Sequence, residues 1–262
     1  MNKMMKKSLV GILIIAVVIP ELYFGGIALQ ILLNVIAAIA SYEIINLNRT
    51  DNNWVLSAVC FAAIAIMEYV SLADFSAVMM LWAVLLFFIE LVDKKINSDF
   101  VVYTFMMSVL FAAALRCVYT LYSFENVKGI WYMLFVGMAC YGCDAGAYFV
   151  GSAIGKHKLI PHVSPNKTWE GAIGGYVIGA VMALAYGLWR LADLPKELII
   201  VSALLLPFVA QVGDLAFSSI KRHFEIKDFG DLLPGHGGVL DRVDSLIFCL
   251  VVFNGLMILW GI

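Results

Sequence analysis

The stretch from Glu197 to Phe217, ELIIVSALLLPFVAQVGDLAF, decides the fold class of this chain. As an α-helix, a segment of this length rises about 30 Å, which matches the hydrocarbon core of a bilayer. Its charged residues are Glu197 at the first position and Asp214 near the end. A nearly uncharged segment of such length is typical of a transmembrane helix.

Apolar stretches of this kind recur along all 262 residues, of which 63% are hydrophobic and 14% are charged. The pattern predicts an all-α, polytopic integral membrane protein and argues against a soluble globular one. All five cysteines fall within apolar stretches, so a disulfide framework is not expected, and the C-x-x-C of Cys140 and Cys143 is interpreted as chance. We expect about nine transmembrane helices, near residues 8–20, 23–47, 54–71, 75–92, 99–121, 130–152, 170–189, 197–217 and 244–261.

The distribution of Lys and Arg predicts that the N-terminus is cytoplasmic. We interpret the basic start and the first apolar run as a retained helix, because no convincing signal-peptide cleavage site follows. In this orientation 13 of the 17 Lys and Arg residues lie on the cytoplasmic side, 3 lie on the other side, and Arg116 lies within a span. Such an excess follows the positive-inside rule. The two polar loops, Gly155–Glu170 and Lys221–Val243, then share the cytoplasmic face and can build one site.

The charged segment Ser218–Asp244, SSIKRHFEIKDFGDLLPGHGGVLDRVD, is the first candidate for function. It follows Asp214, and helical spacing places Ser218, Lys221 and Arg222 on the same face as that acid. A carboxylate at this depth is costly unless it faces a wet cavity, a cation or a metal ion. Asp214 is therefore a functional candidate, and a structural salt bridge is the alternative.

Two more acids follow the glycine-rich turn PGHGG. Asp241 and Asp244 are three residues apart at the start of the last span, so both carboxylates can point the same way. Together with Asp214 they predict a site in which Mg²⁺ bridges the protein and nucleotide phosphates. Capping of the helix N-terminus is the alternative, and it explains one acid better than two.

Basic residues accompany these acids. Lys221, Arg222, Lys227 and Arg242 suit phosphate, although they also serve as topology signals that bind anionic headgroups. A pure membrane anchor needs no carboxylates, so the mixture of signs favours a phosphate site. For His236 three roles stay open: proton carrier, phosphate donor, or a residue of the turn without catalytic duty.

The other polar loop reads GKHKLIPHVSPNKTWEG from Gly155 to Gly171. Its lysines, Lys167 among them, suit phosphate, and Ser164 and Asn166 offer donors, but the loop lacks the Walker pattern. Asp144, upstream in an apolar helix, either joins the site or bonds to a neighbouring helix. Glycines at four-residue spacing predict close helix packing near these loops: Gly142 and Gly146, Gly151 and Gly155, and Gly171, Gly175 and Gly179.

The chain resembles the bacterial phosphatidate cytidylyltransferase family, also called CDP-diacylglycerol synthases. The family signature runs S-x-hydrophobic-K-R, four residues, K-D-x-small, then H-G-G-hydrophobic-x-D-R-hydrophobic-D. Every fixed element is present between Ser218 and Asp244. The elements D-A-x-A-Y-F-x-G from Asp144 and S-P-N-K-T-W-E-G from Ser164 are also similar to the family.

The resemblance implies that CTP and phosphatidic acid are converted to CDP-diacylglycerol and pyrophosphate in phospholipid biosynthesis. It implies Mg²⁺, with a second cation left open, and a multi-pass protein of the bacterial cytoplasmic membrane whose site faces the cytoplasm. The lipid bilayer is an expected partner and nucleic acid is not, while a homodimer stays open. We expect one transmembrane domain over residues 1–262, with apolar helices in 1–130 and catalytic helices and cytoplasmic loops in 131–262.

The resemblance also assigns roles to the candidate residues. The expected metal ligands are Asp214, Asp241 and Asp244, and these act in catalysis with Lys221 and Arg222. The expected substrate-binding residues are Asp144, Ser164, Asn166, Lys167, Ser218, Lys227, His236 and Arg242.

The sequence disfavours three other functions. A CDP-alcohol phosphotransferase is disfavoured because its D-x-x-D-G-x-x-A-R pattern is absent. An ion-coupled transporter would use Asp144 and Asp214 as coupling sites, but the charges concentrate on one face and no inverted repeat is evident. A structural membrane scaffold leaves the H-G-G motif and the paired aspartates unexplained.

Overall fold

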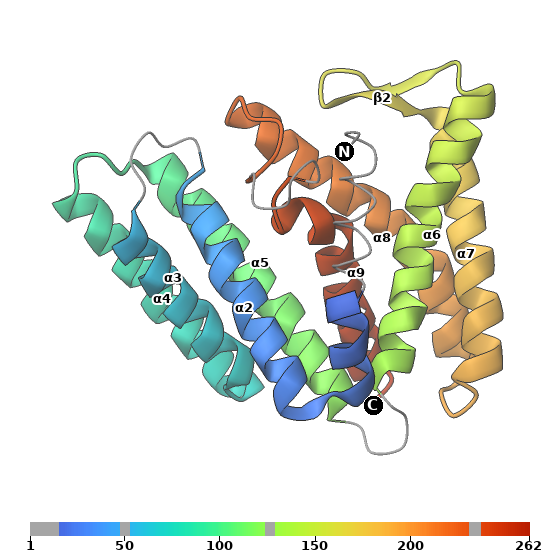
Figure 1. Cartoon of the computed structure of the whole chain (residues 1–262), viewed down its shortest axis with the longest axis horizontal. Coiled ribbons are helices and arrows are strands. Elements are labelled where there is room, and N and C mark those ends of the chain that lie inside the picture. The colour runs from blue at the N-terminus through green and yellow to red at the C-terminus, as the bar shows by residue number, and fades with distance from the viewer. Residues whose placement is uncertain (1–15, 48–52, 124–128, 231–236) are drawn as a thin grey trace. The chain divides into compact units, whose positions relative to one another are not determined.

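The computed structural model describes residues 16–47, 53–123, 129–230 and 237–262, and most of them are helical (Figure 1). Residues 16–24 form a helical stretch ahead of the first complete helix. The helices that follow are α2 Gly26–Ile45, α3 Trp54–Tyr69, α4 Leu72–Val92, α5 Ser98–Tyr122, α6 Gly129–Ile154, α7 Trp169–Arg190, α8 Lys196–His223 and α9 Leu240–Leu259. Two short strands, β1 Lys158–Ile160 and β2 Ser164–Thr168, lie between α6 and α7.

Seven helices in the described part of the chain are long and apolar enough to cross a membrane. This confirms the predicted all-α, polytopic membrane protein. Helix α3, with 16 residues, is shorter than the other apolar helices and rises about 24 Å. The exact number of nine spans stays a prediction, and most of the first predicted span, 8–20, lies outside the described residues.

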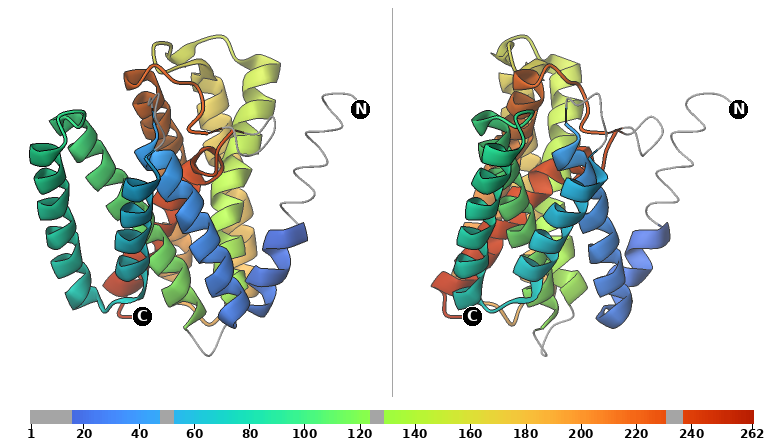
Figure 2. Two further views of the ribbon diagram at one scale, coloured as in Figure 1. Left: turned by 60° about the vertical axis from the view of Figure 1, so that its left-hand side comes forward. Right: turned by 90° about the vertical axis from the view of Figure 1, so that its left-hand side faces the viewer.

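Contacts within the chain divide it into two compact units. The first unit comprises the chain up to Tyr119 together with Asp228–Arg242, and the second comprises Thr120–Lys227 together with Val243–Ile262. The expectation of a single transmembrane domain stays a prediction. In the first unit α2 packs along α3, and in the second α6, α7 and α8 lie side by side (Figure 2).

Charged side chains of the first unit have hydrogen-bond partners that could not be predicted from the sequence. The guanidinium of Arg116 in α5 donates to the carbonyl oxygen of Val70, just beyond the end of α3. The Glu90 carboxylate at the end of α4 accepts a hydrogen bond of 2.6 Å from the Ser98 hydroxyl at the start of α5. These contacts offset the cost of placing charge among apolar helices.

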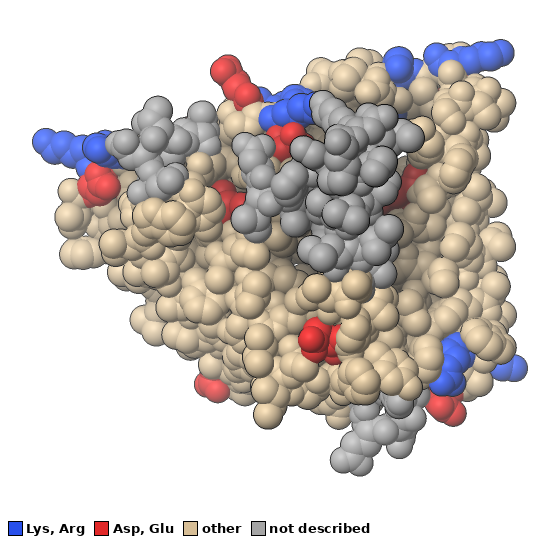
Figure 3. Space-filling view, in the orientation of Figure 1, with Lys and Arg blue, Asp and Glu red and all other residues tan. Residues whose placement is uncertain are grey.

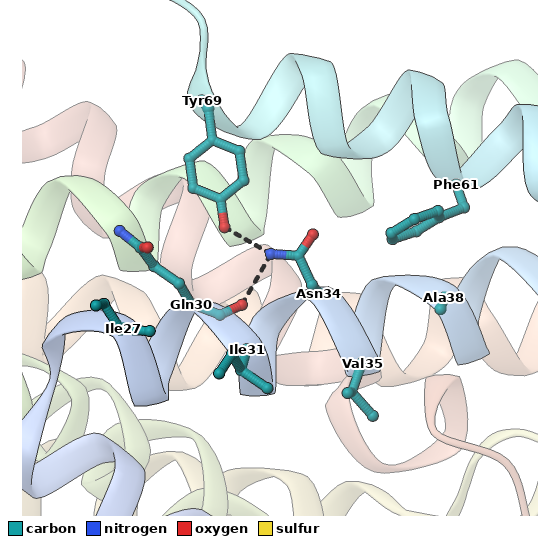
Figure 4. A pocket seen from close by; sticks show the side chains of 8 residues that line it. All are labelled: Ile27, Gln30, Ile31, Asn34, Val35, Ala38, Phe61 and Tyr69. Atoms are coloured by element: carbon teal, nitrogen blue, oxygen red, sulfur yellow. Dashed lines mark hydrogen bonds between the residues drawn. The ribbon is translucent and has the colours of Figure 1, made fainter.

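A groove of about 600 Å³ lies between α2 and α3 in the first unit. Its polar floor is the Asn34 amide, which donates to the Gln30 carbonyl oxygen and to the Tyr69 hydroxyl, each over 2.8 Å (Figure 4). Gln30 and Tyr69 also line the groove, and the other lining side chains, such as exposed Ile27 and Ile31, are apolar. No lining residue is charged, so this groove is not the predicted phosphate site.

Glycines bring α6 and α7 into backbone contact in the second unit, as their spacing predicted. A Cβ atom on Gly146 would lie 3.1 Å from the Cα of Gly175, and one on Gly175 would lie 2.5 Å from the carbonyl oxygen of Cys143. A Cβ atom on Gly179 would lie 2.7 Å from the carbonyl oxygen of Ala139. Side chains at these positions would push the two helices apart.

The substitution Gly175→Ala is therefore expected to destabilise the protein by about 1–3 kcal/mol, because the added methyl group meets backbone atoms that cannot turn away. Gly255→Ala in α9 is the matched control, since nothing lies within 4 Å of a Cβ atom there. An alanine in that helix interior should be neutral or stabilise by up to about 1 kcal/mol. Thermal unfolding in detergent tests the pair, and equal midpoints would contradict the packing argument.

The predicted loop between α6 and α7 contains an antiparallel β-hairpin, which corrects the sequence-based expectation. Lys158 pairs with Thr168 and Ile160 pairs with Ser164, with an irregularity between the two pairs. The hairpin ends where the Thr168 hydroxyl caps α7 by accepting the backbone N–H of Gly171 over 3.2 Å. It thus places the end of β2 directly on the N-terminus of a helix (Figure 1).

Charged side chains of the second unit gather at the ends of its helices on the face drawn in Figure 3, and the flank between them is uncharged. Exposed side chains on α7 include Ile173, Val177 and Val181. Such a flank suits contact with lipid. All five cysteines are free and buried, as expected from their apolar surroundings.

Candidate active site

Three carboxylates from three helices gather in the second unit. Asp144 lies in α6, Asp214 in α8 and Asp244 in α9. The Ser245 hydroxyl links two of them, because it lies 3.4 Å from Oδ2 of Asp144 and 3.3 Å from Oδ1 of Asp244. Asp144 also interacts electrostatically with Asp214. Asp144 therefore bonds to a neighbouring helix and also lies near the other two acids, so its role in substrate binding stays a prediction.

Two lysines lie at this acidic cluster, which we define as Asp144, Asp214 and Asp244. Lys167 at the end of β2 forms a salt bridge with Asp214. Lys221 in the last turn of α8 interacts electrostatically with Asp244. With the acids ionised, the cluster keeps a net negative charge, which suits an added cation better than a bare anion.

Ser218 and Asp214 share a face of α8, as their spacing predicted. The Ser218 hydroxyl lies 3.4 Å from Oδ1 of Asp214, so it can donate a long hydrogen bond to that oxygen. The opposite oxygen, Oδ2, takes the salt bridge to Lys167. Each oxygen of this half-buried carboxylate thus has a partner, and the two contacts together fix the orientation of the Asp214 side chain.

Glu170 in the first turn of α7 holds the hairpin that carries Lys167. Its carboxylate accepts the backbone N–H groups of Lys156 and His157 at 3.1 and 3.2 Å. The same carboxylate lies 2.6 Å from Nδ1 of His157. The backbone N–H of Trp169 closes the hairpin by donating to the His157 carbonyl oxygen over 2.9 Å. These contacts set where Lys167 meets the cluster.

Arg222 has a different set of partners from the predicted phosphate contacts. Its Nε donates to the carbonyl oxygen of Val163 and its Nη1 to that of Ile226, each over 3.2 Å. The side chain thereby ties the hairpin turn to the end of α8. Its contact with phosphate stays a prediction, as do those of Ser164 and Asn166 in β2 and of Lys227 beyond α8.

Asp241 belongs to the first unit, where it binds two backbone N–H groups. Its Oδ2 atom accepts the backbone N–H groups of Phe229 and Gly238 at 2.8 and 2.9 Å, and the residue is 8% exposed. Arg242 follows with an exposed side chain, and its substrate role stays a prediction. His236 lies outside the described residues.

Within the part of the chain that the structure describes, no three His, Cys, Asp or Glu side chains form a group that could hold a metal ion. The metal centre of Asp214, Asp241 and Asp244 therefore stays a prediction. The donor chemistry of the acidic cluster fits Mg²⁺, because carboxylate and hydroxyl oxygens are the ligands that this ion prefers.

Glu43 in α2 has hydrogen-bond partners that could not be predicted from the sequence. Its carboxylate is buried in the first unit and accepts the backbone N–H groups of Val239 and Leu240 at 2.8 and 2.9 Å. The sequence contains one signal of this role: Glu43 is an acid near the end of an apolar stretch, where a carboxylate needs a hydrogen-bond or ion-pair partner. Nothing local linked it to a loop that lies 196 residues away.

Comparison with known proteins identifies the family of this chain. A family model described as "Cytidylyltransferase family" matches residues 5–260. A phosphatidate cytidylyltransferase of Staphylococcus saprophyticus is 31% identical over 265 residues, covering 96% of this chain and 98% of its own length. One of Staphylococcus aureus (strain COL) is 32% identical with the same coverage, and one of Bacillus subtilis is 42% identical over 51% of this chain and 49% of its own. The chain belongs to the cytidylyltransferase family.

Proposed function

We propose that this protein is a phosphatidate cytidylyltransferase, which transfers CMP from CTP to phosphatidic acid and releases pyrophosphate. The observation that carries the proposal is the acidic cluster with Lys167 and Lys221 at its edge. Full-length relatives named for this activity support the choice of substrates. A site that handles a triphosphate and a second phosphate needs both signs of charge at one place.

The reaction exchanges one phosphoanhydride bond for another. An oxygen of the phosphatidic acid phosphate forms a bond to the α-phosphorus of CTP, and the bond from that phosphorus to the bridging oxygen of the β-phosphate breaks. Pyrophosphate leaves with the electron pair of the broken bond, and CDP-diacylglycerol remains. The attacking phosphate monoester is already largely ionised at neutral pH, so the site needs no strong general base.

The protein then contributes mainly position and charge. Lys167, held by Asp214, presents its ammonium group where phosphate oxygens would approach the acids. Lys221 supplies a second cation from the end of α8, and Ser218 steadies Asp214. Lysine acts here as a mobile point charge, which suits a triphosphate whose charge shifts as pyrophosphate leaves.

Mg²⁺ is part of the proposal. Asp214 and Asp244 would hold the ion, with Asp144 beside them. Bound there, Mg²⁺ would neutralise phosphate oxygens and make the α-phosphorus more electrophilic. The site would open to the cytoplasm of a bacterial cell, as the Lys and Arg bias indicates, while the acyl chains of the substrate stay in the bilayer.

The test is an assay of the purified protein with CTP labelled at the α-phosphate, phosphatidic acid in mixed micelles, and Mg²⁺. We expect labelled lipid to form together with an equal amount of pyrophosphate, and both to disappear when EDTA is added. Diacylglycerol in place of phosphatidic acid is the matched control, because it lacks the attacking phosphate. A folded preparation that forms neither product would overturn the proposed function, and activity unaffected by EDTA would overturn the part played by Mg²⁺.

A further inference from the structure

Two carboxylates in the first unit accept four backbone N–H groups, one from Phe229 and three from the consecutive residues Gly238–Leu240. Asp241 accepts the N–H groups of Phe229 and Gly238, and Glu43 accepts those of Val239 and Leu240. Glu43 is 3% exposed and Asp241 is 8% exposed, so water does not replace these bonds. Leu240 is the first residue of α9, and Glu43 therefore binds the helix where it begins.

The glycines of this loop leave room for the Glu43 carboxylate. A Cβ atom on Gly238 would lie 2.5 Å from Oε1 of Glu43, and one on Gly230 would lie 2.9 Å from the same oxygen. Gly237 differs, because its φ of 76° requires glycine and its nearest contact is Asp241. The loop thus lies directly against the carboxylate of Glu43, at two separate glycines.

A carboxylate is the side chain that this position needs. Both of its oxygens accept, and the two N–H groups they bind are among those that have no partner within a helix. The negative charge also lies at the N-terminus of α9, where the helix dipole favours it. Glutamine would present an NH₂ group to one of the two N–H donors and would lose that bond.

We infer that Glu43 is a positioning residue for the reaction: it fixes the start of α9 and with it the places of Asp241 and Arg242, the two residues that follow Leu240 on that helix. It does not itself touch substrate. The expected effect of Glu43 on catalysis rests on the proposed function. Its effect on the start of α9 rests only on the contacts of Glu43.

The substitution Glu43→Gln keeps the size of the side chain and removes one of the two bonds. We expect kcat for CDP-diacylglycerol formation to fall by about 10- to 100-fold, as is usual when a residue that orients a site is lost. KM for CTP should change by less than about threefold, because Lys167 and Lys221 are untouched. Glu43→Asp, which keeps two accepting oxygens on a shorter arm, should retain more activity than Glu43→Gln.

A double-substitution cycle separates this role from general weakening of the fold. Gly238→Ala places a methyl group where the Glu43 carboxylate lies, so it should break the same bonds. The variant Gly238→Ala with Glu43→Gln should then lose little more activity than the worse single variant. Gly255→Ala in α9 is the control, because nothing lies within 4 Å of a Cβ atom there, and adding it to Glu43→Gln should leave the loss of activity unchanged. Additive losses for Gly238→Ala, or wild-type kcat in Glu43→Gln, would overturn the inference.

Hydrogen exchange gives a readout that does not depend on activity. In the wild-type protein the amides of Val239 and Leu240 should be protected, and Glu43→Gln should expose one of the two with little change elsewhere in α9. An inactive wild-type protein with this pattern would overturn the proposed function and leave the role of Glu43 in the loop standing. Unchanged protection in Glu43→Gln would overturn the inference even in an active enzyme.

Discussion

Asp214→Asn is expected to lower kcat for CDP-diacylglycerol formation by about 1000-fold. The change keeps the shape of the side chain but removes the charge that pairs with Lys167 and that would hold Mg²⁺. Asn also offers one accepting oxygen in place of two, so the ion pair with Lys167 becomes at best a neutral hydrogen bond, and Ser218 keeps a partner only by accepting from the Asn NH₂ group. Transfer of label from CTP to lipid, measured with saturating substrates, gives the size of the loss.

The control for this prediction is Asp193→Asn. Asp193 is an exposed acid between α7 and α8, and the same chemical change there should leave kcat within about twofold of the wild type. Thermal unfolding in detergent should show both variants folded. Near-normal turnover of Asp214→Asn would remove this acid from the proposed metal site and from the organisation of Lys167.

The transmembrane helices could be predicted because composition alone carries their signal. An uncharged run of 20 residues has few other stable structures in a bilayer, so the positions of α4 and α7 followed from the sequence with small errors. The helical end of α8 was also predicted. The helix continues beyond the predicted span end at residue 217 to His223, as the helical spacing of Ser218, Lys221 and Arg222 indicated, and the cations of its last turn suit the helix C-terminus.

The neighbours of each helix could not be predicted from spacing. Periodicity tells which residues share a face of one helix, and it correctly joined Asp214 to Ser218. It cannot tell that the α6 acid Asp144 lies near Ser245 of α9. That contact depends on how α6 and α9 pack. The glycine spacing predicted close packing of α6 with α7, and it carried no information about α9.

The hairpin before α7 was missed because its strands lack the usual composition. Strand β2 contains Pro165 and Asn166, which are rare in strands, and it shows no alternation of apolar and polar residues. The hairpin depends instead on contacts made at its ends, by Glu170 and by the backbone of Trp169. A sequence shows these residues but not the bonds between them.

Lys167→Met is the second change for which we expect a large effect, a loss of about 100-fold in kcat. Met keeps the length and apolar stem of the side chain and removes the ammonium group that meets Asp214. Lys158→Met is the matched control, because Lys158 lies on the same hairpin, is exposed, and forms no salt bridge within the described residues. Lys158→Met should keep nearly full activity.

Combining Lys167→Met with Asp214→Asn separates the contribution of this salt bridge to stability from the contribution of Lys167 to catalysis. Alone, Lys167→Met leaves the half-buried Asp214 without its cation and should lower the free energy of unfolding by about 1 kcal/mol. Asn at position 214 removes the unpaired charge, so the double variant should recover that stability. Activity should not recover, because the ammonium group that faces phosphate is still missing. Recovery of both together would mean that Lys167 serves the fold alone, and the transfer of CMP would then need another cation at the acidic cluster.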